Sequence, residues 1–137
     1  MTSAKAVSLL GLRVLVVDDD ADSVDMATTI LVNAGAETRA SRSVADAIAT
    51  LEDWWADILV ADIEMPGADG FSLLRRARSM TSVRGKRLPA LALTAHGRTE
   101  DRMRILSAGF NLHLVKPIDP AELVIAVGSL AGRTGTG

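Results

Sequence analysis

Short apolar runs alternate with longer amphipathic segments five times along this chain of 137 residues. The apolar runs have the length and the β-branched content of strands that are buried on both faces of a sheet. In the segments between them, apolar residues recur every three or four positions, as on one face of a helix. The predicted strands are residues 13–17, 37–40, 57–62, 88–94 and 111–115. The predicted helices are residues 23–34, 43–51, 71–78, 99–108 and 119–130.

Local signals mark several of the predicted helix ends. Ser43 begins a segment that resembles a capping box. Asp119 followed by Pro120 combines a capping side chain with a proline in the first helical turn. Gly35 and Gly109 each follow a helical pattern and supply a helix stop.

Five strand–helix units in succession predict a single α/β domain with a parallel, doubly wound sheet and right-handed crossovers. The length of the chain fits one domain of ordinary size. We expect an N-terminal extension over residues 1–11, the domain over residues 12–131, and a disordered glycine-rich tail over residues 132–137.

The overall composition excludes several kinds of chemistry. The chain has no cysteine, which rules out disulfides, thiolate zinc sites and cysteine nucleophiles. A net charge of -2 does not favour the basic face of a nucleic-acid-binding protein. No apolar stretch approaches the ~20 residues that span a bilayer, and the first residues lack a convincing signal peptide. We therefore expect a cytoplasmic protein with no nucleic-acid partner and no membrane insertion.

Polar side chains gather where the predicted strands end. These residues are Asp18, Asp19 and Asp20 after the first strand, Asp62 at the third, Thr94 at the fourth and Lys116 after the fifth. In open parallel sheets, ligands bind outside the carboxyl ends of the strands, near the point where the strand order reverses. We therefore expect these side chains to share one pocket although they lie far apart in sequence.

The residue types in this predicted pocket suit phosphoryl transfer. Clustered carboxylates repel one another unless a cation lies among them or one of them keeps a proton. A set of ligands made only of oxygen suits a hard cation such as Mg²⁺. The metal and a lysine would neutralise charge on a phosphoryl group, and one carboxylate could be the nucleophile that forms an aspartyl phosphate.

Four motifs, each at a predicted strand end, resemble those of the receiver domain of bacterial two-component response regulators. They are Val16-Val17-Asp18-Asp19, Asp62-Ile63-Glu64-Met65-Pro66 with Asp69-Gly70, Leu93-Thr94-Ala95, and Lys116-Pro117. Each motif alone is weak, but the four together in this order are highly specific. The resemblance covers residues 12–130 and implies a flavodoxin-like (βα)5 fold with strand order 2-1-3-4-5.

The resemblance implies a phosphoacceptor and a metal site. Asp62 would be the phosphoacceptor. Asp19 would bind Mg²⁺ directly, and Asp18 would hold it mainly through water. Asp62 and the backbone carbonyl of Glu64 would complete the ligands that the protein supplies.

The resemblance also implies roles for residues near the end of the fourth strand and beyond. Thr94 would bond a phosphoryl oxygen and act as a switch residue, and Lys116 would pair with Asp62 and then with the phosphoryl group. Pro117 would follow a cis peptide bond. His113 stands where the family often has a switching Tyr or Phe, so it is either a switch residue or a partly exposed strand histidine.

The function implied is a signalling switch that is not an enzyme, although it assists its own phosphorylation and autodephosphorylation. The phosphoryl group would come from a histidine kinase or a histidine phosphotransfer domain. The output face would be formed by the fourth helix, fifth strand and fifth helix, which would bind a downstream protein or a second copy. The chain would be a stand-alone receiver or the receiver of a hybrid kinase.

Two alternatives stay open from the sequence. A haloacid-dehalogenase-type phosphatase would use Asp18 and Asp20 but would leave Asp62 without a role. A pseudo-receiver would share the fold but would not be phosphorylated. In the receiver interpretation Asp20 is expected to begin the loop after the first strand or to cap the first helix. The arginines at 75, 76, 78, 84 and 87 are expected to form a solvated face.

Overall fold

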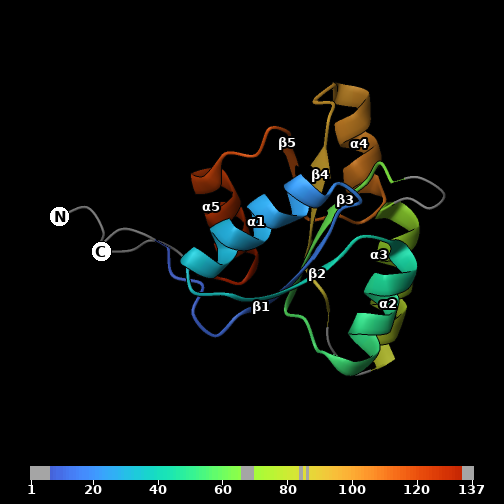
Figure 1. Ribbon diagram of the computed structural model, residues 1–137. Helices are drawn as coiled ribbons and strands as arrows, with labels where there is room; N and C mark the ends of the chain where they lie inside the picture. The colour runs from blue at the N-terminus through green and yellow to red at the C-terminus, as the bar shows by residue number, and fades with distance from the viewer. Residues whose placement is uncertain (1–6, 66–69, 84, 86, 134–137) are drawn as a thin grey trace.

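The structure is a computed structural model, and it describes residues 7–65, 70–83, 85 and 87–133. Within these ranges five strands and five helices alternate along the chain (Figure 1). The strands are β1 Arg13–Val17, β2 Glu37–Ser41, β3 Ile58–Asp62, β4 Ala90–Thr94 and β5 Leu112–Val115. The helices are α1 Ala21–Asn33, α2 Val44–Asp53, α3 Gly70–Val83, α4 Thr99–Ser107 and α5 Pro120–Leu130.

The five strands form one parallel sheet in the order β2-β1-β3-β4-β5, which confirms the predicted fold class. The central strands are buried on both faces, as their apolar sequences predict. In the register, Val17 of β1 lies opposite Ala61 of β3, and Asp62 lies opposite Leu93 of β4. The carboxyl ends of β1, β3 and β4 therefore lie level at one edge of the sheet.

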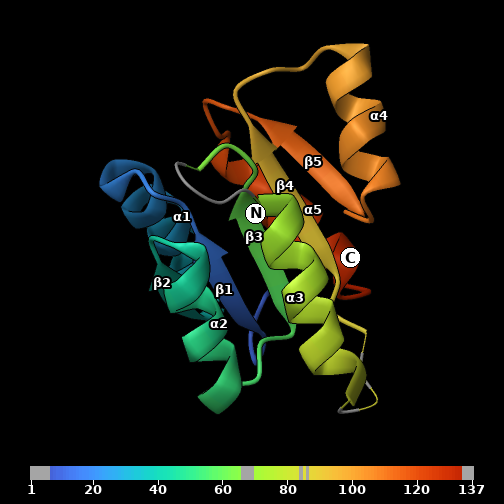
Figure 2. The same ribbon diagram turned by 90° about the vertical axis from the view of Figure 1, so that its right-hand side faces the viewer.

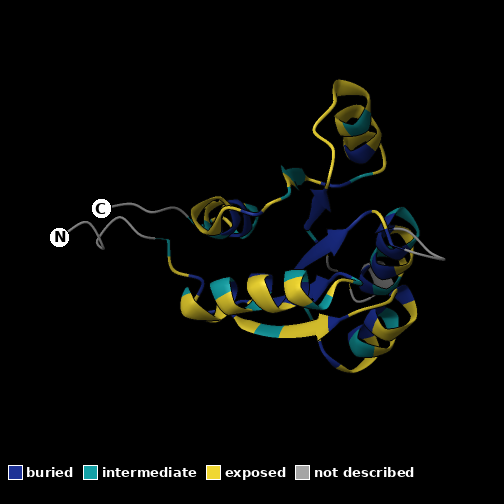
Figure 3. Ribbon diagram, turned by 45° about the horizontal axis from the view of Figure 1, so that its top comes forward, coloured by how far each residue is buried: buried dark blue, intermediate teal, exposed yellow. Residues whose placement is uncertain are grey.

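Helices cover both faces of this sheet (Figures 1 and 2). Successive side chains of a strand point to opposite faces, so Leu15 and Leu59 pack in the core with α2 and α3. Val14 and Val60 pack in the second core with α1 and α5. The helices turn buried faces toward the sheet and exposed faces outward (Figure 3). In α4 only Ile105 is buried, so this helix has a narrower contact with the core than the others.

Helix α1 begins earlier, and helix α3 ends later, than their apolar patterns predict. Helix α1 begins at Ala21 because the Asp20 side chain accepts a hydrogen bond from the Ser23 N–H and caps the helix, as expected. Helix α3 continues to Val83 rather than ending at residue 78. In this last part Thr81 is buried, and its hydroxyl donates to the Arg78 carbonyl inside the helix.

The described part of the predicted N-terminal extension packs against the domain. Leu9 is fully buried, and its N–H donates to the Ala34 carbonyl at 2.8 Å. The Arg133 guanidinium donates to the carbonyl oxygens of Ser8 and Leu10. A Cβ atom on Gly128 of α5 would meet the Val7 side chain at 2.5 Å, so glycine permits this close approach. The domain boundaries themselves stay a prediction, and residues 1–6 and 134–137 lie outside the described residues.

The expectation that the arginines form a solvated face is wrong for Arg78. Its guanidinium donates to the carbonyls of Leu88 and Gly109 and to Oδ1 of Asn111, so it joins α3 to the starts of β4 and β5. Burial lowers the pKa of Arg78, and the nearby charge of Arg87 lowers it further. Of the other four arginines in this set, Arg75, Arg76 and Arg87 are exposed, and Arg84 lies outside the described residues.

Replacing Arg78 tests this anchoring role. Because Arg78→Ala removes the donor from three acceptors at once, we expect it to lower the free energy of unfolding by about 2 kcal/mol. Arg75→Ala, on the exposed face of the same helix, is the matched control and should change it by less than about 0.5 kcal/mol. Urea denaturation measures both. Equal losses in the two variants would contradict the anchoring role.

Candidate functional site: an acidic pocket at the sheet edge

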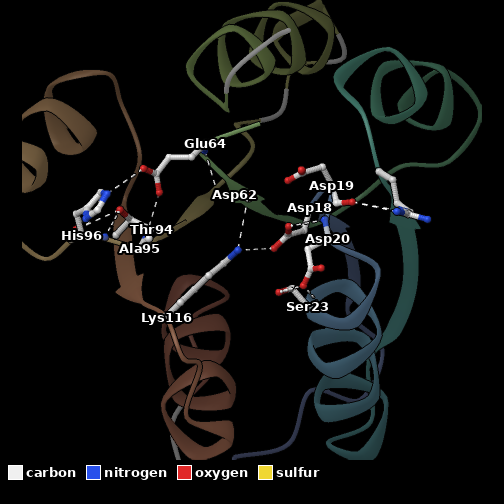
Figure 4. Close-up of polar contacts among 11 residues, drawn as sticks. Asp18, Asp19, Asp20, Ser23, Asp62, Glu64, Thr94, Ala95, His96 and Lys116 are labelled. Atoms are coloured by element: carbon white, nitrogen blue, oxygen red, sulfur yellow. Dashed lines mark hydrogen bonds and ion pairs between the residues drawn. The ribbon is translucent and has the colours of Figure 1, made fainter. Parts of the chain in front are cut away.

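Three carboxylates meet at the carboxyl edge of the sheet. Asp18 follows β1, and Asp62 is the last residue of the neighbouring strand β3. Both are buried, with 1% and 4% of their surface exposed, whereas Asp19 is half-buried. Each of the three residues offers a carboxylate oxygen, and these oxygens lie within 4.8 Å of one another (Figure 4). The structure therefore brings together the three aspartates that the strand-end argument places in one pocket.

Backbone N–H groups hold two of these carboxylates in place. Oδ1 of Asp18 accepts from the N–H of Asp20, and Oδ1 of Asp62 accepts from the N–H of Glu64, both at 3.0 Å. Each bond closes a local turn of three residues directly after a strand. The second oxygen of each carboxylate faces Lys116.

Lys116 supplies a positive charge to the pocket from the end of β5. Its Nζ lies 2.8 Å from Oδ2 of Asp18 and 3.6 Å from Oδ2 of Asp62 (Figure 4). The resemblance implied pairing with Asp62, and the ammonium lies near both carboxylates but closer to Asp18, to which it donates a hydrogen bond. The peptide bond between Lys116 and Pro117 is cis, as the resemblance implied.

The pocket shifts the protonation of two groups. Burial and, to a smaller extent, the charges of Asp18 and Asp19 raise the pKa of Asp62 from its usual 3.8 to about 6, although the hydrogen bond from the Glu64 N–H and the charge of Lys116 oppose the shift. Burial alone would lower the pKa of Lys116, but its hydrogen bond to Asp18 and the two carboxylate charges outweigh burial and raise it.

The fourth strand brings a hydroxyl to the same edge, where it is engaged with its own loop. Thr94 is buried, and its Oγ1 accepts from the His96 N–H at 3.0 Å and donates to the His96 carbonyl at 3.1 Å. The next N–H, that of Ala95, donates to Oε1 of Glu64 at 3.1 Å. Thr94 therefore lies beside the carboxylates but is not hydrogen-bonded to them among the interactions described.

Asp20 does not join the acidic cluster. It is exposed, and its Oδ2 accepts hydrogen bonds from the N–H and the hydroxyl of Ser23 at 3.0 and 2.7 Å. These bonds lower the pKa of Asp20. Asp22 lies in the first turn of α1, where a negative charge suits the helix dipole.

His113 lies half-buried in β5, opposite Ala92 of β4. Its neighbours Leu112 and Leu114 pack against the core formed with α1 and α5. Because strand side chains alternate, His113 points to the opposite face, on the side of α3 and α4. This placement fits either of the two roles that the sequence left open.

Contacts of three further side chains near the pocket were not predicted. The Glu64 carboxylate contacts the N–H of Ala95 and lies 3.5 Å from Nε2 of His96. Arg42 donates to the carbonyl of Asp19 at 3.1 Å. Arg42 directly follows β2, so a search for polar residues at the carboxyl ends of the strands could have found it. No signal in the sequence indicates the contacts of Glu64 and His96.

The chemistry of the pocket fits a divalent cation. Three carboxylates lie close together and one ammonium group contacts two of them, which leaves excess negative charge in a largely buried site. All the candidate ligand atoms are oxygens, as Mg²⁺ prefers.

Comparison with known proteins identifies the family. The model of the response regulator receiver domain matches residues 14–128, and the chain belongs to this family. An uncharacterised 14.6 kDa protein of Leptolyngbya boryana is 42% identical, over 85% of this chain and 88% of its own. The regulatory protein VanRc of Enterococcus gallinarum is 35% identical, over 84% of this chain and 48% of its own, so this chain spans about half of VanRc. The crystal structure of a putative response regulator from Chloroflexus aurantiacus is 34% identical with a TM-score of 0.80, covering 89% of this chain and 98% of that one.

Membership of this family defines the general function. Receiver domains are phosphoacceptors of two-component signalling that bind Mg²⁺ at an acidic pocket, interact with histidine kinases or phosphotransfer proteins, and are generally not enzymes. The phosphatase alternative required Asp20 to act beside Asp18, whereas Asp20 caps α1. Among the described residues, no helix has both the length and the apolar character needed to cross a membrane.

The burial of Asp62 beside two other carboxylates predicts a pH-dependent stability. Because the pKa of Asp62 is raised above the ~3.9 of an unfolded chain, the native state holds this proton more tightly. The free energy of unfolding should therefore fall as the pH rises from about 4 to about 6, and then stay at the lower level. In metal-free buffer, Asp62→Asn should raise it by about 1–2 kcal/mol at pH 8 and change it little at pH 4.

Urea denaturation at both pH values checks this expectation. Asp25→Asn, which removes an exposed carboxylate of α1, is the matched control and should change the free energy of unfolding by less than about 0.5 kcal/mol at either pH. A stability loss in Asp62→Asn at pH 8 would contradict the inferred cost of burying the Asp62 carboxylate beside its acidic neighbours.

Proposed function

We propose that Asp62 is the phosphoacceptor and receives a phosphoryl group from a phosphohistidine of a histidine kinase or a phosphotransfer domain in the cytoplasm. The observation that carries this proposal is the convergence of three carboxylates within 4.8 Å with the Lys116 ammonium against two of them. Asp18, Asp19, Asp62 and the carbonyl of Glu64 would hold Mg²⁺. The bound cation would neutralise charge on the phosphoryl oxygens.

The transfer step uses groups of this chain. An oxygen of the Asp62 carboxylate attacks the phosphorus and forms an O–P bond, while the P–N bond to the donor imidazole breaks. The imidazole nitrogen keeps the electron pair of that bond and takes a proton from the solvent. Lys116, 3.6 Å from Asp62, would neutralise charge on the transferred group. In this way the domain assists its own phosphorylation, and the same groups would assist water in removing the phosphoryl group.

The switch would follow from a change of hydrogen-bond partners at Thr94. Its hydroxyl now bonds the backbone of His96, and it would turn to a phosphoryl oxygen on Asp62. That turn would shift the loop between β4 and α4, and His113 beneath α4 would follow. The output face over α4, β5 and α5 includes the exposed apolar residues Met103, Leu106, Val115 and Ile125, and it would bind a downstream protein or a second copy.

Phosphorylation by a small donor tests the acceptor. With Mg²⁺ and acetyl phosphate we expect an acid-stable, base-labile adduct of one phosphoryl group, detected by intact mass. Asp62→Asn should form no adduct, and Lys116→Ala should form it more slowly. Asp25→Asn is the matched control and should behave like the wild type. An adduct that persists in Asp62→Asn would show that the acceptor is another residue. If the wild type formed no adduct and bound no Mg²⁺, the pseudo-receiver alternative would be favoured.

Metal binding is tested by thermal unfolding. A ligand that binds only the native state, present at about ten times its Kd, adds about 1.4 kcal/mol of stability. We therefore expect Mg²⁺ to raise the Tm by roughly 5 °C. Asp19→Asn should lose most of this shift. The matched control is Asp20→Asn, at the next position in sequence. It should retain the shift, because asparagine can still cap helix α1. Equal shifts in the two variants would contradict the assigned ligands.

A further inference from the structure

The Glu64 side chain joins two loops beside the proposed acceptor. Glu64 lies two residues after Asp62, and its Oε1 accepts from the N–H of Ala95 in the loop after β4 (Figure 4). Its Oε2 lies 3.5 Å from Nε2 of His96 in the same loop. The N–H of Glu64 also donates to Oδ1 of Asp62. One residue therefore holds the acceptor through its main chain and the neighbouring loop through its carboxylate.

The position of the Ala95 N–H gives this contact its significance. Ala95 follows Thr94, the last residue of β4, and Asp62 at the end of β3 lies opposite Leu93 of β4. The N–H of Ala95 is thus a hydrogen-bond donor at the edge of the sheet where a phosphoryl group on Asp62 would place its three oxygens. Backbone N–H groups at such a position stabilise anions. Here the donor is already bound to an anion, the carboxylate of Glu64.

We propose that Glu64 is an internal stand-in for the phosphoryl group: its carboxylate occupies the Ala95 N–H in the unphosphorylated protein and leaves it when Asp62 is modified. The proposal rests on the proposed function, because it takes Asp62 as the acceptor. It adds a positioning residue, Glu64, which ties the loop between β4 and α4 to the loop after β3. The Glu64 carboxylate would compete with the phosphoryl oxygens for the Ala95 N–H. The exchange replaces one acceptor at the Ala95 N–H by another.

The exposure of the contact sets its expected strength. The side chains of Glu64 and His96 are 44% and 51% exposed, so water competes for both. A hydrogen bond of this kind contributes modestly to stability, so in a fraction of the molecules the Glu64 carboxylate is away from the Ala95 N–H. Since the apparent affinity for an incoming group is reduced by the fraction of protein that is competent to bind it, loss of the contact should speed adduct formation roughly three- to tenfold.

A negative charge beside the acceptor could also slow phosphorylation by repulsion alone, without any bond to Ala95. Glu64→Asp separates the two explanations, because it keeps the charge but is one methylene too short to preserve the bridge. Glu64→Ala removes both the charge and the bridge. Both variants keep the Glu64 backbone carbonyl that is proposed to bind Mg²⁺. Glu52→Asp, at an exposed position near the C-terminal end of α2, is the matched control for the side-chain change.

The experiment measures the rate of adduct formation with acetyl phosphate above pH 7 at saturating Mg²⁺, followed by intact mass. We expect Glu64→Ala and Glu64→Asp to react three to ten times faster than the wild type, and Glu52→Asp to match the wild type. If Glu64→Asp reacts at the wild-type rate, charge alone acts and the proposal is overturned. Equal rates in all four proteins overturn it as well.

A second measurement does not depend on phosphorylation. Amide hydrogen exchange of Ala95, followed by NMR in the unmodified protein, should be protected in the wild type and at least threefold faster in both Glu64 variants. Unchanged exchange overturns the proposal. A wild type that forms no adduct would contradict the proposed function, and the exchange rates would still show whether Glu64 occupies the Ala95 N–H.

Discussion

Repulsion among Asp18, Asp19 and Asp62 is the constraint on which the site depends. Burying carboxylates together is unfavourable unless a cation or a proton compensates their charge. Within the described residues the compensation comes from Lys116, which is 98 positions away from Asp18 in sequence. The parallel sheet makes this pairing possible, because β1, β3 and β5 all end at the same edge. The surrounding apolar strands keep the carboxylates in place at a cost in stability.

Apolar packing elsewhere in the domain compensates for the unfavourable clustering of carboxylates at this edge. The central strands are buried on both faces between two helical layers, so the ends of β1 and β3 are set by apolar contacts and not by the site itself. Backbone N–H groups then fix one oxygen of Asp18 and one of Asp62. By contrast, α4 has one buried residue, Ile105. A rigid acidic edge next to a loosely packed helix suits a domain that converts a local change of charge into a movement of its surface.

The sequence predicted most of this architecture because burial and strand ends leave a strong pattern. The apolar runs located the strands, and the polar residues that follow them located Asp18, Asp62, Thr94 and Lys116. The contacts that a polar side chain makes with other elements leave no such pattern in the sequence. Arg78 has the same helical surroundings as its exposed neighbours, and only the positions of β4 and β5 make it an anchor. The contacts of Glu64 likewise depend on the distance between two loops, which a single sequence does not encode in its periodicity.

The unequal distances from Lys116 have a consequence for reactivity. Burial raises the pKa of Asp62 to about 6, and Lys116, which lies closer to Asp18 than to Asp62, offsets only part of this rise. A carboxylate with a raised proton affinity is a better nucleophile when ionised, but it is lost to protonation as the pH falls through that value. Near neutral pH the Asp62 carboxylate is ionised, and Lys116 neutralises its charge only in part. A divalent cation at the same edge would lower the pKa of Asp62 and extend the pH range in which it is ionised toward acid, so cation binding and the proposed acceptor chemistry would be coupled through one charge balance.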